Sequence, residues 1–302
     1  MIVRPRPHWL RMLFVLRGSV LPDIAPQLVA ATGFAVLVAM CHGQLLQWKI
    51  QLTFVPFSLI GLTLAIFLGF RNSTSYARYW EARMLWGVLL NDTRSLVRQA
   101  LTHIDDPSHT RDFAMYLIAF VHALRHQLRG SDPSPDLRRL LSDSDCVRLQ
   151  NLRYKPAALL LHASHWVREK RQEGVLSPVL VPVIESSMTH LCDALGGCER
   201  IANTPIPFTY SVLIHRTVFT YCLLLPFGLV DSIGAMTPVV AGFIAYTFFA
   251  LEAVAAEIEE PFGMAPNDLA LDAMSSMIEE SLREMLGEQL PEKPDAAEII
   301  LT

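Results

Sequence analysis

The chain has 302 residues, of which 52% are hydrophobic and only 18% charged, and its formal net charge is −4. This composition excludes a disordered chain, a collagen and a small disulfide-rich scaffold; it argues against an ordinary cytosolic enzyme and gives no sign of nucleic-acid binding. The five cysteines are scattered without a C-x-x-C pair, which argues against a disulfide framework or a zinc knuckle and fits a reducing interior.

Near the N-terminus, residues 9–17 (WLRMLFVLR) mix aliphatic and basic side chains at helical spacing. This pattern predicts an interfacial helix that lies along the inner leaflet of a membrane. Pro22-Asp23 interrupts what would otherwise resemble a cleavable signal peptide, so an uncleaved membrane protein is expected. The N-terminal flank holds four arginines before any acidic residue: Arg4, Arg6, Arg11 and Arg17.

Four apolar runs approach the ~20 residues that a membrane span requires. They cover roughly residues 28–46, 54–70, 210–230 and 233–251, and they form two pairs that flank a polar-rich middle segment. Lysine and arginine gather before the first run and after the second, whereas the short links hold few charges. The positive-inside rule therefore places both termini and the middle segment in the cytoplasm.

The middle segment is expected to be helical throughout. Asn91-Asp92 is a candidate N-cap, and Gly196-Gly197 is a candidate helix stop. Residues 113–121 are apolar but too short to span a bilayer, so they are expected to form the centre of a cytoplasmic helical core. The tail after residue 257 is acidic, and its last ten residues are expected to fray.

Three long runs resemble the bestrophin family in its bacterial branch. They are LGFRNSTSYARYWEARMLWG (68–87), CERIANTPIPFTYSVLIHR (198–216) and EIEEPFGMAPNDL (257–269), and the order of elements also matches. The resemblance covers nearly the whole chain. It implies a homopentameric ion channel whose single pore is lined by the second span and then by cytoplasmic helices.

Leu62, Ile66 and Phe70 stand four residues apart, so they share one side of the second helix. Taken alone, such a triple indicates lipid or helix packing. The resemblance implies instead that these residues form the neck of the pore, where five copies would make apolar rings that exclude water. Gly61 and Gly69 would let neighbouring helices approach closely.

The resemblance also implies a second constriction in the cytoplasmic helices, and by position its best match is Leu180. Packing of Leu180 in a core is the alternative. Pro261-Phe262-Gly263 resembles the calcium clasp of the family, but only one carboxylate, Asp268, follows closely. Calcium prefers six to eight oxygen ligands, so no metal ligand and no cofactor is assigned.

Other polar residues are interpreted structurally. Asn72, Ser73, Thr74 and Ser75 are expected to extend a polar surface, which either solvates ions or marks a helix that emerges into water. Arg71 is expected to be an interfacial anchor that reaches lipid headgroups and an ion-pair partner. His215 and Arg216 are expected to pair with Glu252, Glu257 or Glu259, because charge at the end of a span is costly unless paired. Pro205 and Pro207 should interrupt the helix before the third span. His122 and His126 are expected to be satisfied histidines and not metal ligands.

The sequence therefore predicts an all-α polytopic membrane protein with four transmembrane helices and a cytoplasmic helical block, assembled as a ring-shaped homopentamer. Residues 1–87 hold the interfacial helix and spans one and two, 88–209 the cytoplasmic helices, 210–256 spans three and four, and 257–302 the acidic tail.

The expected activity is passive conduction of small monovalent ions through the apolar neck, in the bacterial inner membrane and without enzymatic chemistry. Chloride is the ion associated with the family, while the acidic tail would favour cations at the cytoplasmic mouth. The alternative is a membrane-anchored scaffold or sensor whose cytoplasmic helices bind a partner, and a membrane enzyme is the third possibility. Ion flux in protein-only liposomes separates the first function from the others.

Overall fold

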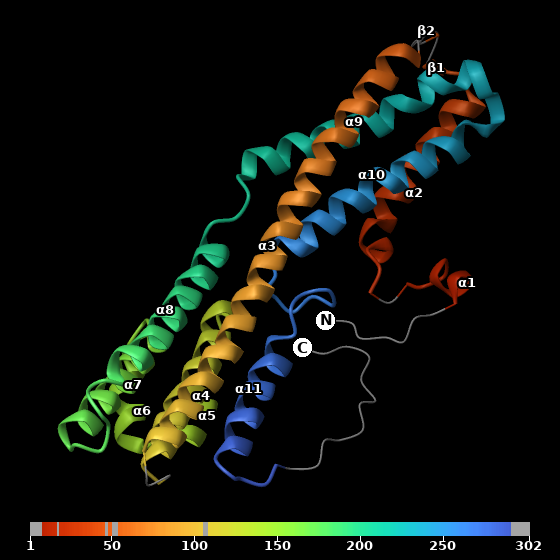
Figure 1. Ribbon diagram of the computed structural model, residues 1–302. Helices are drawn as coiled ribbons and strands as arrows, with labels where there is room; N and C mark the ends of the chain where they lie inside the picture. Colours follow the sequence, from red (N-terminus) through yellow and green to blue (C-terminus); the bar gives the residue numbers. More distant parts are fainter. Residues whose placement is uncertain (1–7, 17, 46–47, 50–53, 105–107, 291–302) are drawn as a thin grey trace. The chain divides into compact units, whose positions relative to one another are not determined.

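The computed structural model describes the chain except for residues 1–7, 17, 46–47, 50–53, 105–107 and 291–302 (Figure 1). The described residues are almost entirely helical, which confirms the all-α class. The exception is a short antiparallel ladder between β1 (Gln44–Leu45) and β2 (Trp48–Lys49). The expected fraying of the last ten residues lies outside the described part of the chain.

The described residues form two compact units. Unit 2 lies within Arg4–Tyr79 and Pro205–Glu260, and unit 1 within Trp80–Thr204 and Pro261–Thr302. One helix, α3 (Phe54–His103), belongs to both. Each unit has its own internal contacts.

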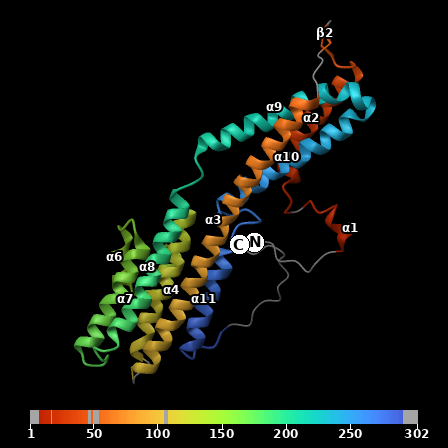
Figure 2. The same ribbon diagram turned by 45° about the horizontal axis from the view of Figure 1, so that its top comes forward.

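Unit 2 is a bundle of long apolar helices. Its elements are α1 (Trp9–Met12), α2 (Leu21–Met40), the first part of α3, α9 (Phe208–Ile233), the 3-10 helix η1 (Gly234–Met236) and α10 (Thr237–Glu259). Helices α2, α9 and α10 pack on one another, as both views show (Figure 2). With the first part of α3 they share an apolar core that includes Ala35, Leu68, Val218 and Phe249, all of them buried.

By length and composition, three helical stretches among the described residues are suited to cross a membrane: Leu21–Met40, Val55–His103 and Phe208–Glu259. The third stretch contains two helices, α9 and α10, joined by η1. At 1.5 Å per residue, the 50 residues of α3 extend over about 75 Å, far more than the ~30 Å of a bilayer core. Only part of α3 can therefore lie in lipid.

Two expected helix boundaries in the middle segment are wrong. Helix α3 continues through Asn91-Asp92, and α8 (Val181–Asn203) continues through Gly196-Gly197. Asp92 does not cap a helix but lies 3.5 Å from His190 of α8. A Cβ on Gly197 would stand 2.8 Å from a methyl of Leu85, so this glycine permits close packing of α8 against α3 and does not end the helix.

Unit 1 is built around α4 (Ser108–Arg129). This helix contacts α5 (Ser134–Leu140), α7 (Lys155–Gln172), α8 and α11 (Leu271–Met285), while α6 (Asp143–Gln150) contacts α5. Residues 113–121 are mostly buried, and Phe113 stacks on Trp166 with ring centroids 4.5 Å apart. The expectation that this run is the centre of a helical core is confirmed.

The break expected at Pro205 and Pro207 is also confirmed, because α8 ends at Asn203 and α9 begins at Phe208.

Candidate pore site

Within unit 2, α3 has two opposite faces. The buried face carries Phe57, Leu64 and Leu68, which pack in the apolar core of the unit. The other face, here called the neck face, consists of Leu62, Ile66 and Phe70. Their exposed fractions are 61%, 50% and 64%, so these side chains are not part of the unit's own core. An apolar face left open on a membrane helix is available to lipid, to another subunit or to a pore.

The packing of α3 against α9 helps to set the direction of the neck face. Gly61 lies beside Tyr221 of α9, and a Cβ at Gly61 would stand 2.8 Å from the tyrosine Oη. Tyr221 also contacts Phe57, with ring centroids 6.0 Å apart. Gly61 therefore allows the close helix approach expected of it, whereas a Cβ on Gly69 would meet no described atom within 4 Å.

An apolar groove of about 390 Å³ lies between α3 and α9, next to the neck face. Its two threonines do not make it polar, because Thr63 donates to the carbonyl of Leu59 and Thr217 donates to that of Leu213. The groove presents an almost purely apolar surface, lined by Leu59, Ile60, Thr63, Leu64, Phe67, Leu213, Ile214 and Thr217.

Directly after Phe70, the buried face of α3 becomes charged. Arg71 is only 5% exposed, so its expected role as an anchor in lipid headgroups is wrong, whereas its expected role as an ion-pair partner is confirmed. Its guanidinium nitrogens lie 3.6 Å from Glu259 Oε2 and 4.0 Å from Glu252 Oε1, both on α10. Among the described residues, Arg71 Nε has no hydrogen-bond partner. Arg71 is thus a buried cation that two carboxylates compensate at ion-pair distance.

The pairing expected near the start of the third span is confirmed for His215. His215 Nδ1 lies 2.8 Å from Glu252 Oε1. Glu259 accepts a hydrogen bond from the backbone N–H of Ile206 at 3.0 Å, and its own carbonyl accepts one from Arg78 Nε at 3.1 Å. These contacts join α3, α9 and α10 in one polar cluster, here called the Glu259 cluster.

The polar residues after the neck face divide between two environments. Ser73 and Thr74 are exposed, as expected of a polar surface. Ser75 is fully buried, so it does not belong to that surface. Asn72 donates from Nδ2 to the carbonyls of Leu68 and Leu251, which ties α3 to α10.

In unit 1, Leu180 is the N-cap residue of α8 and is half-buried, beside Val179, which is 81% exposed. Pro182 follows in the first turn, where its missing N–H costs no helical hydrogen bond. Leu180 therefore stands at a helix start with a largely exposed neighbour. Both the constriction and the core interpretation are compatible with this position.

The segment after Pro261 folds back on itself. Asp268 is 4% exposed and its Oδ2 accepts the N–H of Ala265 at 2.7 Å, while the N–H of Leu269 donates to the carbonyl of Pro261 at 3.0 Å. Across the described residues, no three His, Cys, Asp or Glu side chains are grouped to hold a metal ion. The Asp268 carboxylate is already engaged in stabilising its own turn.

A second charged cluster, which the sequence did not reveal, fastens α11 to α4 and α5. Glu279 accepts hydrogen bonds from Arg139 Nη2 and Arg283 Nε, each at 2.8 Å, and His122 Nε2 lies at the same distance. Burial by itself raises the pKa of Glu279, but the hydrogen bonds from Arg139, His122 and Arg283 outweigh it and hold the pKa well below its usual range. His122 thus has a carboxylate partner at Nε2, but its buried Nδ1 has no hydrogen-bond partner among the described residues. His126 is a satisfied histidine, as expected, because its Nε2 lies 3.0 Å from Asp136 Oδ2.

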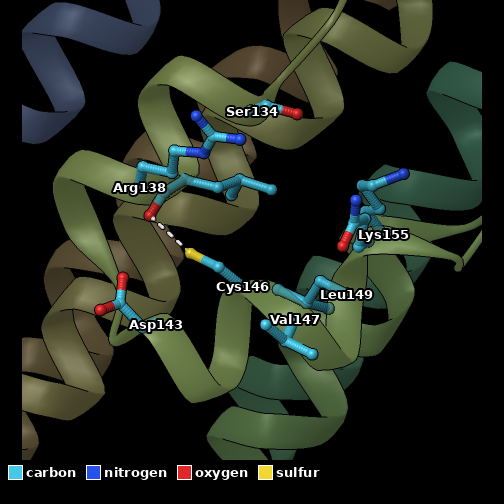
Figure 3. Close-up of a pocket in the computed structure, with 9 residues that line it drawn as sticks. Ser134, Arg138, Asp143, Cys146, Val147, Leu149 and Lys155 are labelled. Atoms are coloured by element: carbon cyan, nitrogen blue, oxygen red, sulfur yellow. Dashed lines mark hydrogen bonds between the residues drawn. The ribbon is translucent and has the colours of Figure 1, made fainter.

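A pocket of about 280 Å³ lies among α5, α6 and the start of α7 (Figure 3). Arg138 and Lys155 line it, and the thiol of Cys146 points to the carbonyl of Leu137 at 3.5 Å. Burial, with Asp143 and Asp145 nearby, raises the pKa of Cys146. The thiol is therefore protonated near neutral pH and is not an activated nucleophile.

Comparison with known proteins identifies relatives along nearly the whole chain. The profile of a family described as bacterial/fungal bestrophin proteins matches residues 1–284. A voltage-dependent anion channel-forming protein of Ralstonia nicotianae is 51% identical over 95% of each chain, and one of Escherichia coli is 42% identical over 97% of each. The crystal structure of a bacterial bestrophin homolog from Klebsiella pneumoniae has 41% identity and a TM-score of 0.86, and covers 88% of this chain and 100% of that one.

Proposed function

Because the chain belongs to the bacterial and fungal bestrophin family, we propose that it forms a ring-shaped homopentamer whose central pore passively conducts small monovalent ions. The family membership makes the chain a membrane ion channel and not an enzyme. The pentamer, the pore lining and the ion preference are the parts of the proposal that experiments must test.

The observation that carries the proposal is the pair of opposite faces on α3. The neck face is apolar and at least half exposed at each residue, while the opposite face packs in the core of unit 2. In a ring of five copies, the neck faces would line the axis as stacked apolar rings. Such rings control conduction by excluding water. The apolar groove between α3 and α9 supplies a surface on which a neighbouring subunit packs.

For the membrane topology we propose four spans: α2, the first part of α3, α9 and α10. With four spans and an arginine-rich N-terminal flank, both termini would lie in the cytoplasm by the positive-inside rule. The membrane in question would be the bacterial inner membrane. Residues 88–209 and 257–302 then form the cytoplasmic region. Leu180 provides the second, cytoplasmic constriction, for which its position beside the exposed Val179 is the support.

For the ion we propose chloride or another small anion, because the relatives are named as anion channel-forming proteins. The neck face itself carries no charge that would select either sign. The reversal potential of the purified protein in a planar bilayer under a salt gradient reports the preference by its sign. A reversal potential with the sign expected for cations would mean that the same pore prefers cations.

Ion flux into liposomes that contain only this protein tests conduction directly. Flux above that of empty liposomes is expected, and it should change when the neck face is altered. If purified, correctly assembled protein gives no flux, the alternative of a membrane-anchored scaffold or sensor is favoured, in which the helices of unit 1 bind a partner.

A further inference from the structure

We propose that Glu259 is a positioning residue for the pore: through Arg71 and Arg78 it fixes the rotation of α3 about its axis and so keeps the neck face toward the pore. The effect on the pore rests on the proposed function, but the rotation of α3 can be measured independently of ion flux.

Glu259 stands where α10 ends, and it connects three segments of unit 2. One carboxylate oxygen, Oε1, accepts the N–H of Ile206, which precedes α9, at 3.0 Å. The other, Oε2, lies 3.6 Å from Arg71 Nη2 on α3. The backbone carbonyl accepts a hydrogen bond from Arg78 Nε, two turns further along α3, at 3.1 Å. A single, largely buried residue thus holds α3 at two points.

These contacts matter because the apolar packing of α3 within unit 2 ends at this level. Up to Leu68 the buried face is made of aliphatic and aromatic side chains, which pack without strong directional preference. Between Arg71 and Arg78, the last part of α3 that belongs to unit 2, the same face is polar, with Ser75 fully buried one turn after Arg71. The orientation of the helix then depends on ion pairs and hydrogen bonds, which are directional.

The position of Arg71 on α3 couples its own placement to the direction of the neck face. It directly follows Phe70, and successive residues of an α-helix are turned by about 100°. Anchoring Arg71 to α10 therefore also determines where Phe70 and the turn before it point. Asn72, which donates to the carbonyl of Leu251 at 3.1 Å, holds the same part of α3 in place.

Arg71 depends strongly on Glu259 for compensation. Its nearest other carboxylate, Glu252, is further away at 4.0 Å and also bonds to His215. Without the Glu259 charge, a guanidinium that is 5% exposed would keep, within the described part of the chain, only this shared and more distant carboxylate. Burying a charge with insufficient compensation is costly, so Arg71 would move toward solvent and α3 would turn with it.

The test measures the rotation of α3 by thiol labelling. Ile66→Cys places a thiol on the neck face, and a small membrane-impermeant thiol reagent labels it in liposomes. Peptide mass spectrometry reads that site separately from the native cysteines. Glu259→Gln keeps the side-chain size and an oxygen that accepts the Ile206 N–H, but removes the charge opposite Arg71. Glu260→Gln makes the same charge change at an exposed neighbour and serves as the control.

We expect Glu259→Gln to change the labelling rate at position 66 by about fivefold or more, and Glu260→Gln to leave it within about twofold. Combining Glu259→Gln with Arg71→Gln removes both charges of the pair and should bring the rate back toward that of the parent. Equal rates for the Glu259→Gln and Glu260→Gln proteins would overturn the proposal, as would a double variant whose labelling rate stays as far from that of the parent as the rate of Glu259→Gln alone.

Ion flux distinguishes this inference from the proposed function. If the parent protein carries no flux, the proposed function fails, and the labelling rates still decide whether Glu259 orients α3. If the parent conducts and Glu259→Gln changes neither labelling nor flux, only the positioning role is refuted.

Discussion

Shortening a side chain of the neck face should widen and wet the proposed constriction. We expect Ile66→Ala to raise single-channel conductance, with Phe70→Ala acting in the same direction. The barrier in an apolar neck is the free energy of thinning the water around an ion, and smaller side chains leave more room for that water. Ion selectivity should change little, because no charge is removed.

The size of the effect follows from the symmetry of the ring. If each truncated side chain lowers the barrier by only about 0.3 kcal/mol, well below the ~0.8 kcal/mol associated with one buried CH2 group, five subunits together lower it by about 1.5 kcal/mol. That corresponds to roughly tenfold in rate, since about 1.4 kcal/mol is one decade. Ile66 is 50% exposed within its own chain, so its truncation should cost little of the packing of unit 2.

The assay is single-channel recording of the purified variants beside the parent, with the oligomer checked by size. Ile233→Ala is a matched control: the same substitution in unit 2, at a residue at the end of α9 that is 36% exposed and belongs neither to the neck face nor to the groove. Conductance should rise for Ile66→Ala and stay near the parent value for Ile233→Ala. Unchanged conductance in intact oligomers of all three neck-face alanine variants would mean that another face of α3 lines the pore.

Four further outcomes are expected. A reporter fused to the C-terminus should report the cytoplasm, and periplasmic activity would contradict the even number of spans. Micromolar calcium should not increase flux, because the Asp268 carboxylate is occupied by a backbone N–H; a calcium response abolished by Asp268→Ala would refute this. Glu279→Gln should lower the unfolding free energy by about 3 kcal/mol while exposed Glu284→Gln has little effect, as thermal unfolding can show. The pKa of Glu279 is lowered in the fold. The contribution of this carboxylate to the free energy of unfolding should therefore be constant above its ordinary pKa of 4.5 and disappear as the pH falls toward the lowered value, as thermal unfolding at a series of pH values can show. Gly61→Ala should destabilise the α3–α9 contact by about 1–3 kcal/mol, measured by detergent unfolding, and removing the hydroxyl with Tyr221→Phe should recover part of the loss.

Much of the architecture can be predicted from the order of the residues. Long apolar runs must be removed from water and must satisfy their backbone hydrogen bonds internally, which predicts helices at α2, α9 and α10. The burial of residues 113–121 follows from an apolar run that is too short to span. Helical geometry alone places Leu62, Ile66 and Phe70 on one side of α3, because residues four positions apart are neighbours on a helix.

The contacts of the charged residues depended on tertiary structure. Local sequence marked Arg71 as a headgroup anchor and Asn91-Asp92 as a helix start, yet Arg71 is buried and α3 is continuous. Arg78 and Glu259 lie 181 positions apart, and Glu279 is 140 positions from Arg139. Whether a charge lies in water or in a buried pair is decided by which distant segments pack beside it, and a local pattern contains no information about those neighbours.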